Sequence, residues 1–414
     1  MHSPRRFRRA FRTAAVLGAT GALLAGGLTA CSSDSDDSAA SSGPTVELTE
    51  KAATGEAIKI GVISSEGGPV SAPAPREAAE AAVRYLNDNA GGVNGHKIDL
   101  VVCKQHEEAA SATACANEMV EKKVAAVISP FSSMGAVIGP IIVGAKIPYI
   151  SQAPVSAIEY GLPGAYMLSG GGYAVLAGQA AHAAKNKYKK VTVIIGDTGD
   201  AAASIGKLGG AIFKQVGVEF KVVTVPTSTA DVVPVITAGL ADKPDAVSIL
   251  GDAKQCSTAI KALQTVAPDI KKYLITSCLD SNVTDATGED AIEGSVAFTT
   301  VNPMTDDPTV NLFRSVLAKY SPSTDIRGLA YLGYQPIMSI AEAGKALPAG
   351  PVTAEQIHAA LKGAKDLPVP AAPGLTFTCD GKQVPQMPTL CGKSILVSDI
   401  GADLAFENTV VENK

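Results

Sequence analysis

Short apolar runs alternate with amphipathic stretches along most of the chain. Runs rich in valine and isoleucine, such as 58–64, 97–103 and 124–129, have the length and composition of buried strands. Between them, 76–89 and 107–122 carry apolar residues at the helical period. Because strands and helices that alternate in this way connect through right-handed crossovers, the pattern predicts parallel sheets covered by helices on both faces.

The alternation runs through two consecutive series, which predicts two sheets. The first series continues with a helix at 134–145 and a strand at 147–151. The second series is predicted to contain strands at 190–196, 218–225, 246–250 and 273–276, and helices at 175–184, 202–216, 232–240 and 257–266. We therefore expect an α/β fold of two lobes, each a mainly parallel sheet flanked by helices.

The C-terminal part of the chain changes character. Helices are expected at 308–320, at 328–347 and from Thr353 onward, where the spacing to Gln356 makes a capping box. Near the end, the segments 375–379 and 394–397 predict a small antiparallel addition that the last two cysteines close. We expect lobe 1 at 56–172 plus 304–366, and lobe 2 at 173–303 plus 367–414.

Residues 1–30 have the pattern of an export signal peptide. Five arginines precede the apolar run 14–30, which is short for a membrane span. The sequence Leu28-Thr29-Ala30-Cys31 at its end resembles the lipobox processing site of bacterial lipoproteins. The resemblance implies that Cys31 is lipidated and anchors the mature chain to the outer face of the bacterial cell membrane. An uncleaved anchor and an ordinary secretory signal remain alternatives, and both Sec and twin-arginine export stay open.

A polar segment follows the signal. From Ser32 to Gly55 the chain consists mainly of Ser, Asp, Ala and Gly, with almost no large apolar side chain. Such a composition cannot bury enough surface to fold. We therefore expect residues 31–55 to form a lipidated, disordered tether between the membrane and the folded body.

The mature chain is predicted to be acidic. Removal of the five arginines in the signal changes the formal net charge from −5 to −10. Nucleic acids and anionic membrane surfaces both select basic partners. We therefore expect no nucleic-acid partner, and contact with the membrane only through the lipid.

The cysteines fall into local pairs. Of seven cysteines, six remain once Cys31 is set aside for lipid. In an oxidising compartment these six favour three disulfides, although sequence alone allows about 15 connectivities. The spacing favours Cys103 with Cys115, Cys256 with Cys278, and Cys379 with Cys391. A metal site is the alternative, but the chain has no CxxC and its five histidines are scattered.

Catalytic signatures are missing from the sequence. It has no Gly-x-Ser-x-Gly elbow, no His-Glu-x-x-His, no Walker loop and no Gly-x-Gly-x-x-Gly after the first predicted strand. The glycine run 170–172 is interpreted as a flexible crossing between lobes. We expect neither an enzyme nor a cofactor. An esterase or amidase, the alternative of a different class, would need a base close in space to Ser132.

Two polar loops follow strands of the first series. The loop 129–134 places Ser132 and Ser133 at a helix start, where free backbone N–H groups favour a carboxylate or another polar acceptor. The loop 151–156 ends with Ser156. Because ligands of parallel sheets bind at the carboxyl ends of strands, we expect a binding site here. The alternative for Ser132 is a simple helix cap.

From about residue 58 to the C-terminal region the chain resembles a known family, and the most specific motifs lie in residues 58–103. The strand Ile58 to Val62, then Gly68-Pro69-Val70, a helix and the turn Gly91-Gly92-Val93-Asn94-Gly95, are similar to the opening of periplasmic binding proteins of the branched-chain amino acid (Leu/Ile/Val) type. The resemblance implies a type I periplasmic-binding-protein fold. Two lobes joined by three crossings would close on a small ligand and deliver it to the permease of an ATP-binding-cassette (ABC) importer.

The same resemblance implies which residues touch the ligand. Its carboxylate would be held by Ser132, Ser133, Ala153 and Ser156. The candidates to meet an amino group are Asp252 and Asp280, which could equally be solvated loop residues. The family's tyrosine after the strand at 190–196 is replaced here by residues that include Asp200, and Tyr173 could supply an aromatic wall or simply pack at the crossing.

These observations together predict a receptor without catalytic activity. We expect a monomeric, lipid-anchored extracytoplasmic solute-binding protein for a small polar ligand, such as an amino acid or a related amide or carboxylate. A lipoprotein module that senses the ligand and signals to a membrane receptor or kinase is the alternative. A hydrolase is the less favoured one.

Overall fold

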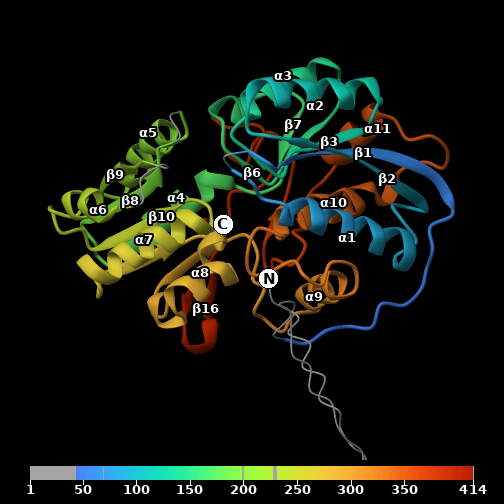
Figure 1. Cartoon of the computed structure of the whole chain (residues 1–414). Helices are drawn as coiled ribbons and strands as arrows, with labels where there is room; N and C mark the ends of the chain where they lie inside the picture. Colours follow the sequence, from blue (N-terminus) through green and yellow to red (C-terminus); the bar gives the residue numbers. More distant parts are fainter. Residues whose placement is uncertain (1–42, 69, 198–199, 227–230, 414) are drawn as a thin grey trace, which may run out of the picture. The chain divides into compact units, whose positions relative to one another are not determined.

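The computed structural model describes residues 43–413 except 69, 198–199 and 227–230 (Figure 1). The expected signal peptide, the lipidation site Cys31 and the tether up to residue 42 lie outside the described residues.

A five-stranded parallel sheet forms the centre of lobe 1. Its strand order is β2-β1-β3-β5-β7, so the chain order reverses beside β1. The strands are β1 (Gly55–Ser65), β2 (His96–Gln105), β3 (Ala126–Ile128), β5 (Tyr149–Ser151) and β7 (Ala165–Met167). In sheets of this kind, the crevice for a ligand lies at the carboxyl ends of the strands where the order reverses.

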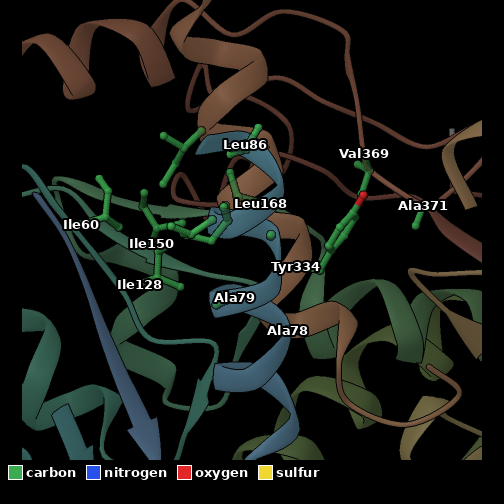
Figure 2. Close-up of a cluster of buried hydrophobic side chains, with 14 of the residues drawn as sticks. Ile60, Ala78, Ala79, Leu86, Ile128, Ile150, Leu168, Tyr334, Val369 and Ala371 are labelled. Carbon is green, nitrogen blue, oxygen red and sulfur yellow. The ribbon is translucent and has the colours of Figure 1, made fainter. Parts of the chain in front are cut away.

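Helices pack on both faces of this sheet because its strands are apolar on both sides. Ile60 and Val62 of β1 point into one core, whereas Ile63 points into the other. Figure 2 shows the first core, where Ile60, Ile128 and Ile150 gather beside α1. The first core is covered by α1 (Ala74–Asn89), α9 (Pro308–Tyr320), α10 (Tyr331–Ala343) and α11 (Ala354–Lys362), and the second by α2 (Ala109–Glu121) and α3 (Gly135–Gly144).

A seven-stranded sheet forms lobe 2, in the order β16-β15-β12-β11-β10-β8-β9. The part from β9 to β12 is parallel, and the last two strands are antiparallel. The strands are β8 (Lys190–Gly196), β9 (Glu219–Val225), β10 (Ala246–Leu250), β11 (Lys271–Leu274), β12 (Val296–Thr299), β15 (Ile395–Ile400) and β16 (Phe406–Glu412). The helices are α4 (Gly171–Lys185), α5 (Asp200–Gln215), α6 (Val233–Gly239), α7 (Ala253–Val266) and α8 (Ser281–Thr287). The expected α/β class with two mainly parallel sheets is confirmed.

The expected boundary after residue 366 is wrong. The segment 367–391 packs in lobe 1, where Phe377, Cys379 and Cys391 join the core beside α1. The reason is backbone pairing, since Met167 N–H donates to Thr389 O at 2.9 Å and Cys391 N–H donates to Met167 O at 2.8 Å. Lobe 2 therefore resumes only near β15.

The two tail segments expected to form one antiparallel addition belong to different sheets. The short strand β14 (Thr376–Phe377) pairs with β13 (Leu367–Pro368), whereas β15 pairs with β12 and β16. In the described part of the chain, the backbone passes between the two main sheets after β7, after β12 and before β15. These three passages agree with the crossings that the resemblance implied.

The expected tether also ends earlier than residue 55. Residues 43–54 lie against lobe 1, and Ala53 is only 3% exposed. Lys51 N–H donates to Asp88 O at 2.9 Å and Ala53 N–H to Asn87 O at 2.7 Å. These carbonyls belong to the last turn of α1, which has no intrahelical partners for them. The tether prediction is therefore wrong for residues 43–54.

The three expected disulfides are confirmed: Cys103 with Cys115, Cys256 with Cys278, and Cys379 with Cys391. The expected capping box is confirmed as well, because Thr353 and Gln356 exchange hydrogen bonds at the start of α11. No helix within the described residues is long and apolar enough to cross a membrane.

Candidate functional site

Two polar loops of lobe 1 lie side by side at the carboxyl ends of its strands. The loop after β3 contains β4 (Phe131–Ser132), and the loop after β5 contains β6 (Ala153–Pro154). These short strands pair in parallel, with Phe131 opposite Ala153. Ser156 Oγ also donates to Ser133 O at 3.5 Å. The structure thus brings together the four lobe 1 positions that the resemblance implied, and we call Ser132, Ser133 and their backbone N–H groups the serine loop.

The serine loop binds a carboxylate of the chain itself, that of Glu107. Oε1 of Glu107 accepts from Ser65 Oγ at 2.5 Å and from Ser132 Oγ at 2.9 Å. Oε2 accepts from the Ser133 N–H at 2.9 Å, and the Ser133 hydroxyl donates to it as well. The amide of Gln105 makes a further contact with Oε1. Glu107 therefore occupies the position that the resemblance implied for the ligand's carboxylate.

A left-handed turn after β2 directs Glu107 to this position. Its φ angle is 57°, a conformation that residues other than glycine seldom adopt. The turn is held because the Glu107 N–H donates to Gln105 Oε1 at 2.6 Å, and Gln105 is completely buried. Gln105 Nε2 in turn donates to Ser65 Oγ at 2.8 Å and Ser132 Oγ at 3.1 Å.

The hydroxyl groups keep Glu107 ionised. Burial raises the pKa of Glu107, but the hydrogen bonds from Ser133, Ser65 and Gln105 lower it by more, so the pKa lies below its ordinary value. Within the described residues, no lysine, arginine or histidine forms an ion pair with Glu107. The neighbouring Glu66 differs, because it is paired with Arg76 at 2.6 Å and Lys104 at 3.0 Å.

The interpretation of Ser132 as a helix cap is only partly right. Ser132 Oγ accepts from the Met134 N–H at 2.9 Å, so it does satisfy a backbone donor near the start of α3. The same hydroxyl donates to Glu107. Ser132 therefore links the start of α3 to the Glu107 carboxylate.

A second carboxylate, Glu159, holds the loop that contains β6. It is 1% exposed, and its Oε2 accepts from Val155 N–H at 3.0 Å and Ser156 N–H at 2.8 Å. Its Oε1 accepts from Tyr149 Oη at 2.8 Å. Burial raises the pKa of Glu159 to about 7 in spite of these donors. The lack of a side chain at Gly135 makes room for the Glu159 carboxylate, because a Cβ at residue 135 would lie 2.3 Å from Glu159 Cδ.

The two candidate aspartates of lobe 2 are helix caps. Asp252 Oδ1 accepts from the Gln255 N–H at 2.8 Å and begins α7. Asp280 Oδ1 accepts from the Asn282 N–H at 2.9 Å and begins α8. Each carboxylate thus has a local structural partner, and a role in ligand binding stays a prediction for both.

Tyr173 and Asp200 are the remaining candidates. Tyr173 lies near the start of α4 and packs partly buried against the core beneath α2 and α3, as the packing interpretation expected. Asp200 is the first residue of α5. Whether either residue touches a ligand stays a prediction. No group of three possible metal ligands occurs among the described residues.

A hollow of about 540 Å³ lies elsewhere in lobe 1, away from the serine loop. It is lined by Gly161 to Tyr166 at the amino end of β7, by Lys362 and by parts of the segment around the Cys379–Cys391 disulfide. None of the candidate site residues lines it. Since chemistry in a parallel sheet gathers at the opposite, carboxyl ends of the strands, we take the serine loop as the candidate site.

Comparison with known proteins agrees with this architecture. The periplasmic binding protein family matches residues 57–390, and the chain belongs to it. Membership places the folded body outside the cytoplasm, in a class of proteins that bind small solutes. No curated protein matches the chain.

Solved structures of this class share the type I fold at low sequence identity. A leucine binding protein of Thermotoga maritima is 19% identical over 85% of this chain and 98% of its own, with a TM-score of 0.69. A branched-chain amino acid transporter substrate binding protein of Streptococcus pneumoniae, in complex with isoleucine, is 20% identical over 86% and 99%, with a TM-score of 0.68. A solute binding protein of R. palustris, in complex with 4-hydroxybenzoate, is 19% identical over 86% and 97%, with a TM-score of 0.70.

Proposed function

We propose that this chain is the solute-binding receptor of an ABC importer. The observation that carries the proposal is the pair of hydrogen-bonding loops, β4 beside β6, at the carboxyl ends of the lobe 1 strands in a member of the periplasmic binding protein family. A small polar solute would contact these loops. Closure of lobe 2 over it would exclude water and allow a few hydrogen bonds to fix the solute.

The ligand contacts are proposed residue by residue. Ser132, Ser133, Ala153 and Ser156 form the lobe 1 side. Tyr173 and Asp200 are further candidates. The local partners of Asp252 and Asp280 favour a role as helix caps alone over their predicted role in ligand binding. We propose no catalysis, because Ser132 Oγ bonds to a carboxylate, an amide and a backbone N–H, and no histidine reaches it within the described residues.

The proposal includes a lipid anchor on Cys31. The motif Leu28-Thr29-Ala30-Cys31 supports it. Labelling of cells with radioactive palmitate should mark the wild-type chain, whereas the C31A variant should remain unlabelled and be released from membranes. Equal labelling of both variants would remove the anchor from the account.

A thermal-shift screen tests the receptor function. Protein lacking residues 1–42 keeps the packed segment 43–54 and should be screened against amino acids, amides, amines, polyols and small organic acids. A solute at about 100 times its dissociation constant should add about 2.7 kcal/mol of stability. Loss of the gene should then abolish uptake of that solute. A changed transcriptional response with unchanged uptake would favour the sensing alternative, and turnover of ester or amide substrates would favour a hydrolase.

A further inference from the structure

The donors of the serine loop are already in use. The Ser133 N–H and the Ser132 and Ser133 hydroxyls all donate to Glu107, which comes from the end of a different strand. A solute carboxylate would need the same donors. It would also lie in contact with the Glu107 carboxylate, and two carboxylates that share one site cannot easily both be ionised.

The Glu107 carboxylate has little capacity left for a solute. A carboxylate has about four lone-pair sites. Ser65, Ser132 and Gln105 lie against Oε1, and both the N–H and the hydroxyl of Ser133 donate to Oε2. The group is therefore saturated by the protein, as a bound ligand carboxylate would be.

The charges around the serine loop also disfavour a solute carboxylate. Glu66, at the adjacent strand end, is already neutralised by Arg76 and Lys104. Among the described residues, Glu107 itself takes part in no ion pair. This end of lobe 1 consequently presents a fixed negative charge where an anionic solute would have to approach.

We propose that Glu107 is a specificity-determining residue that fills the carboxylate position of the site. The solute of this protein therefore presents no carboxylate to the serine loop. It is an uncharged or cationic molecule, such as an amide, a polyol or an amine. This inference rests on the proposed receptor function for the identity of the solute, but the occupancy of the loop by Glu107 can be tested without any solute.

Chemical rescue by acetate is that test. The E107A variant removes the carboxylate and leaves three donors of the serine loop without an acceptor, so its melting temperature should fall by about 3 °C or more. Acetate at tens of millimolar should restore part of the loss, whereas acetamide at equal concentration and ionic strength should not. The control is E108A, which removes the adjacent exposed glutamate, whose side chain makes none of the described hydrogen bonds. Wild type and E108A should not respond to acetate.

Two results would overturn the assignment. One is acetate stabilising wild type as much as E107A, which would show that the loop is open in wild type. The other is an E107A protein that melts like wild type and ignores acetate. If E107A does not fold, E107Q replaces it. The amide offers one acceptor oxygen instead of two, so E107Q should melt lower than wild type at pH 7 and approach it at acidic pH.

Matched acid and amide pairs test the class of solute. Leucine against leucinamide, lactate against lactamide and 4-hydroxybenzoate against 4-hydroxybenzamide differ mainly at the carboxylate. Where a pair binds wild type, the amide should bind about tenfold tighter or more, and E107A should shift the preference towards the acid. An acid that binds wild type more tightly than its amide would overturn the inference and leave the receptor function standing. A blank panel would count against the receptor function, and the acetate result would still decide the role of Glu107.

Discussion

The two lobes use the polar residues at the ends of their strands differently. In lobe 1, Ser132 and Ser133 donate to Glu107, which is 25 and 26 residues away in the sequence. In lobe 2, Asp252 accepts from a residue three positions on, and Asp280 from one two positions on. Lobe 1 therefore builds a tertiary polar cluster, whereas lobe 2 builds local helix caps.

This difference distinguishes polar residues that are informative about ligand binding from polar residues that only stabilise a helix end. A capping aspartate satisfies orphan N–H groups in any helix and carries no information about a ligand. A carboxylate brought to a loop by a distant strand end must be positioned by tertiary contacts, here by buried Gln105 and a left-handed turn. We therefore expect changes in lobe 1 to alter solute selection and changes in lobe 2 caps to alter stability alone.

The largest effects should come from the disulfides that flank the two sets of loops. Cys103–Cys115 closes the segment that carries Glu107, and Cys256–Cys278 closes the segment between the two aspartate caps. Each double cysteine-to-alanine variant should lose about 3 kcal/mol of unfolding free energy in urea titrations. Only the lobe 1 variant should also change the acid-to-amide preference. An equal change of the acid-to-amide preference in both disulfide variants would contradict the proposed difference between the two lobes.

Replacement of Glu159 should change the stability by a comparable amount, and this change should depend on pH. Its pKa is raised to about 7 in the folded protein against 4.5 ordinarily, so the unfolded chain releases the proton first and stability should fall as pH rises from about 4.5 to 7. In E159Q the amide oxygen can accept from Val155 and Ser156, and the variant should be about 2–3 kcal/mol more stable than wild type at pH 8. Equal unfolding curves for both proteins across this range would contradict the expectation.

Gly135 should be the most sensitive glycine of α3. A methyl group there would meet the Glu159 carboxylate, so G135A should cost about 1–3 kcal/mol through overpacking. The matched control is G144A at the other end of the same helix, where a Cβ meets nothing within 4 Å. That variant should be neutral or more stable by up to about 1 kcal/mol. Urea unfolding of the two variants side by side checks the contrast.

Glu107 should show the opposite pH dependence to Glu159. Because its pKa is lowered on folding, its stabilisation is present above the ordinary pKa of 4.5 and is lost as pH falls through the folded-state pKa. Wild type should exceed E107Q by about 1–3 kcal/mol at pH 7, and the difference should disappear in acid. A difference that stays constant down to pH 3 would show that the carboxylate charge does not matter.

The smallest effects are expected from the lobe 2 caps. D252A and D280A should each lose about 1 kcal/mol of stability. Neither should change the affinity for a solute more than a helix-surface control such as D285A. A tenfold or larger loss of affinity in either cap variant would place that aspartate in the binding site after all.

The sheets and the disulfides could be predicted from local sequence patterns. The candidate site could be predicted only in part. Strands such as 58–64 and the paired cysteines are encoded by short-range patterns, so both could be predicted. Glu107 was expected inside a helix at 107–122, but its left-handed turn depends on Gln105 and on serines 25 residues away. An acidic residue directly after the strand beside β1 was the one available signal. The position of 367–391 likewise depends on backbone bonds to Met167.

A crystal structure of the wild-type protein with its solute bound is the most direct test of the central claim. The account predicts that Glu107 stays on the serine loop, with its carboxylate accepting from Ser132 and Ser133, while the solute presents an uncharged or cationic group nearby. A solute carboxylate bound to the Ser133 N–H, with Glu107 displaced into solvent, would contradict it.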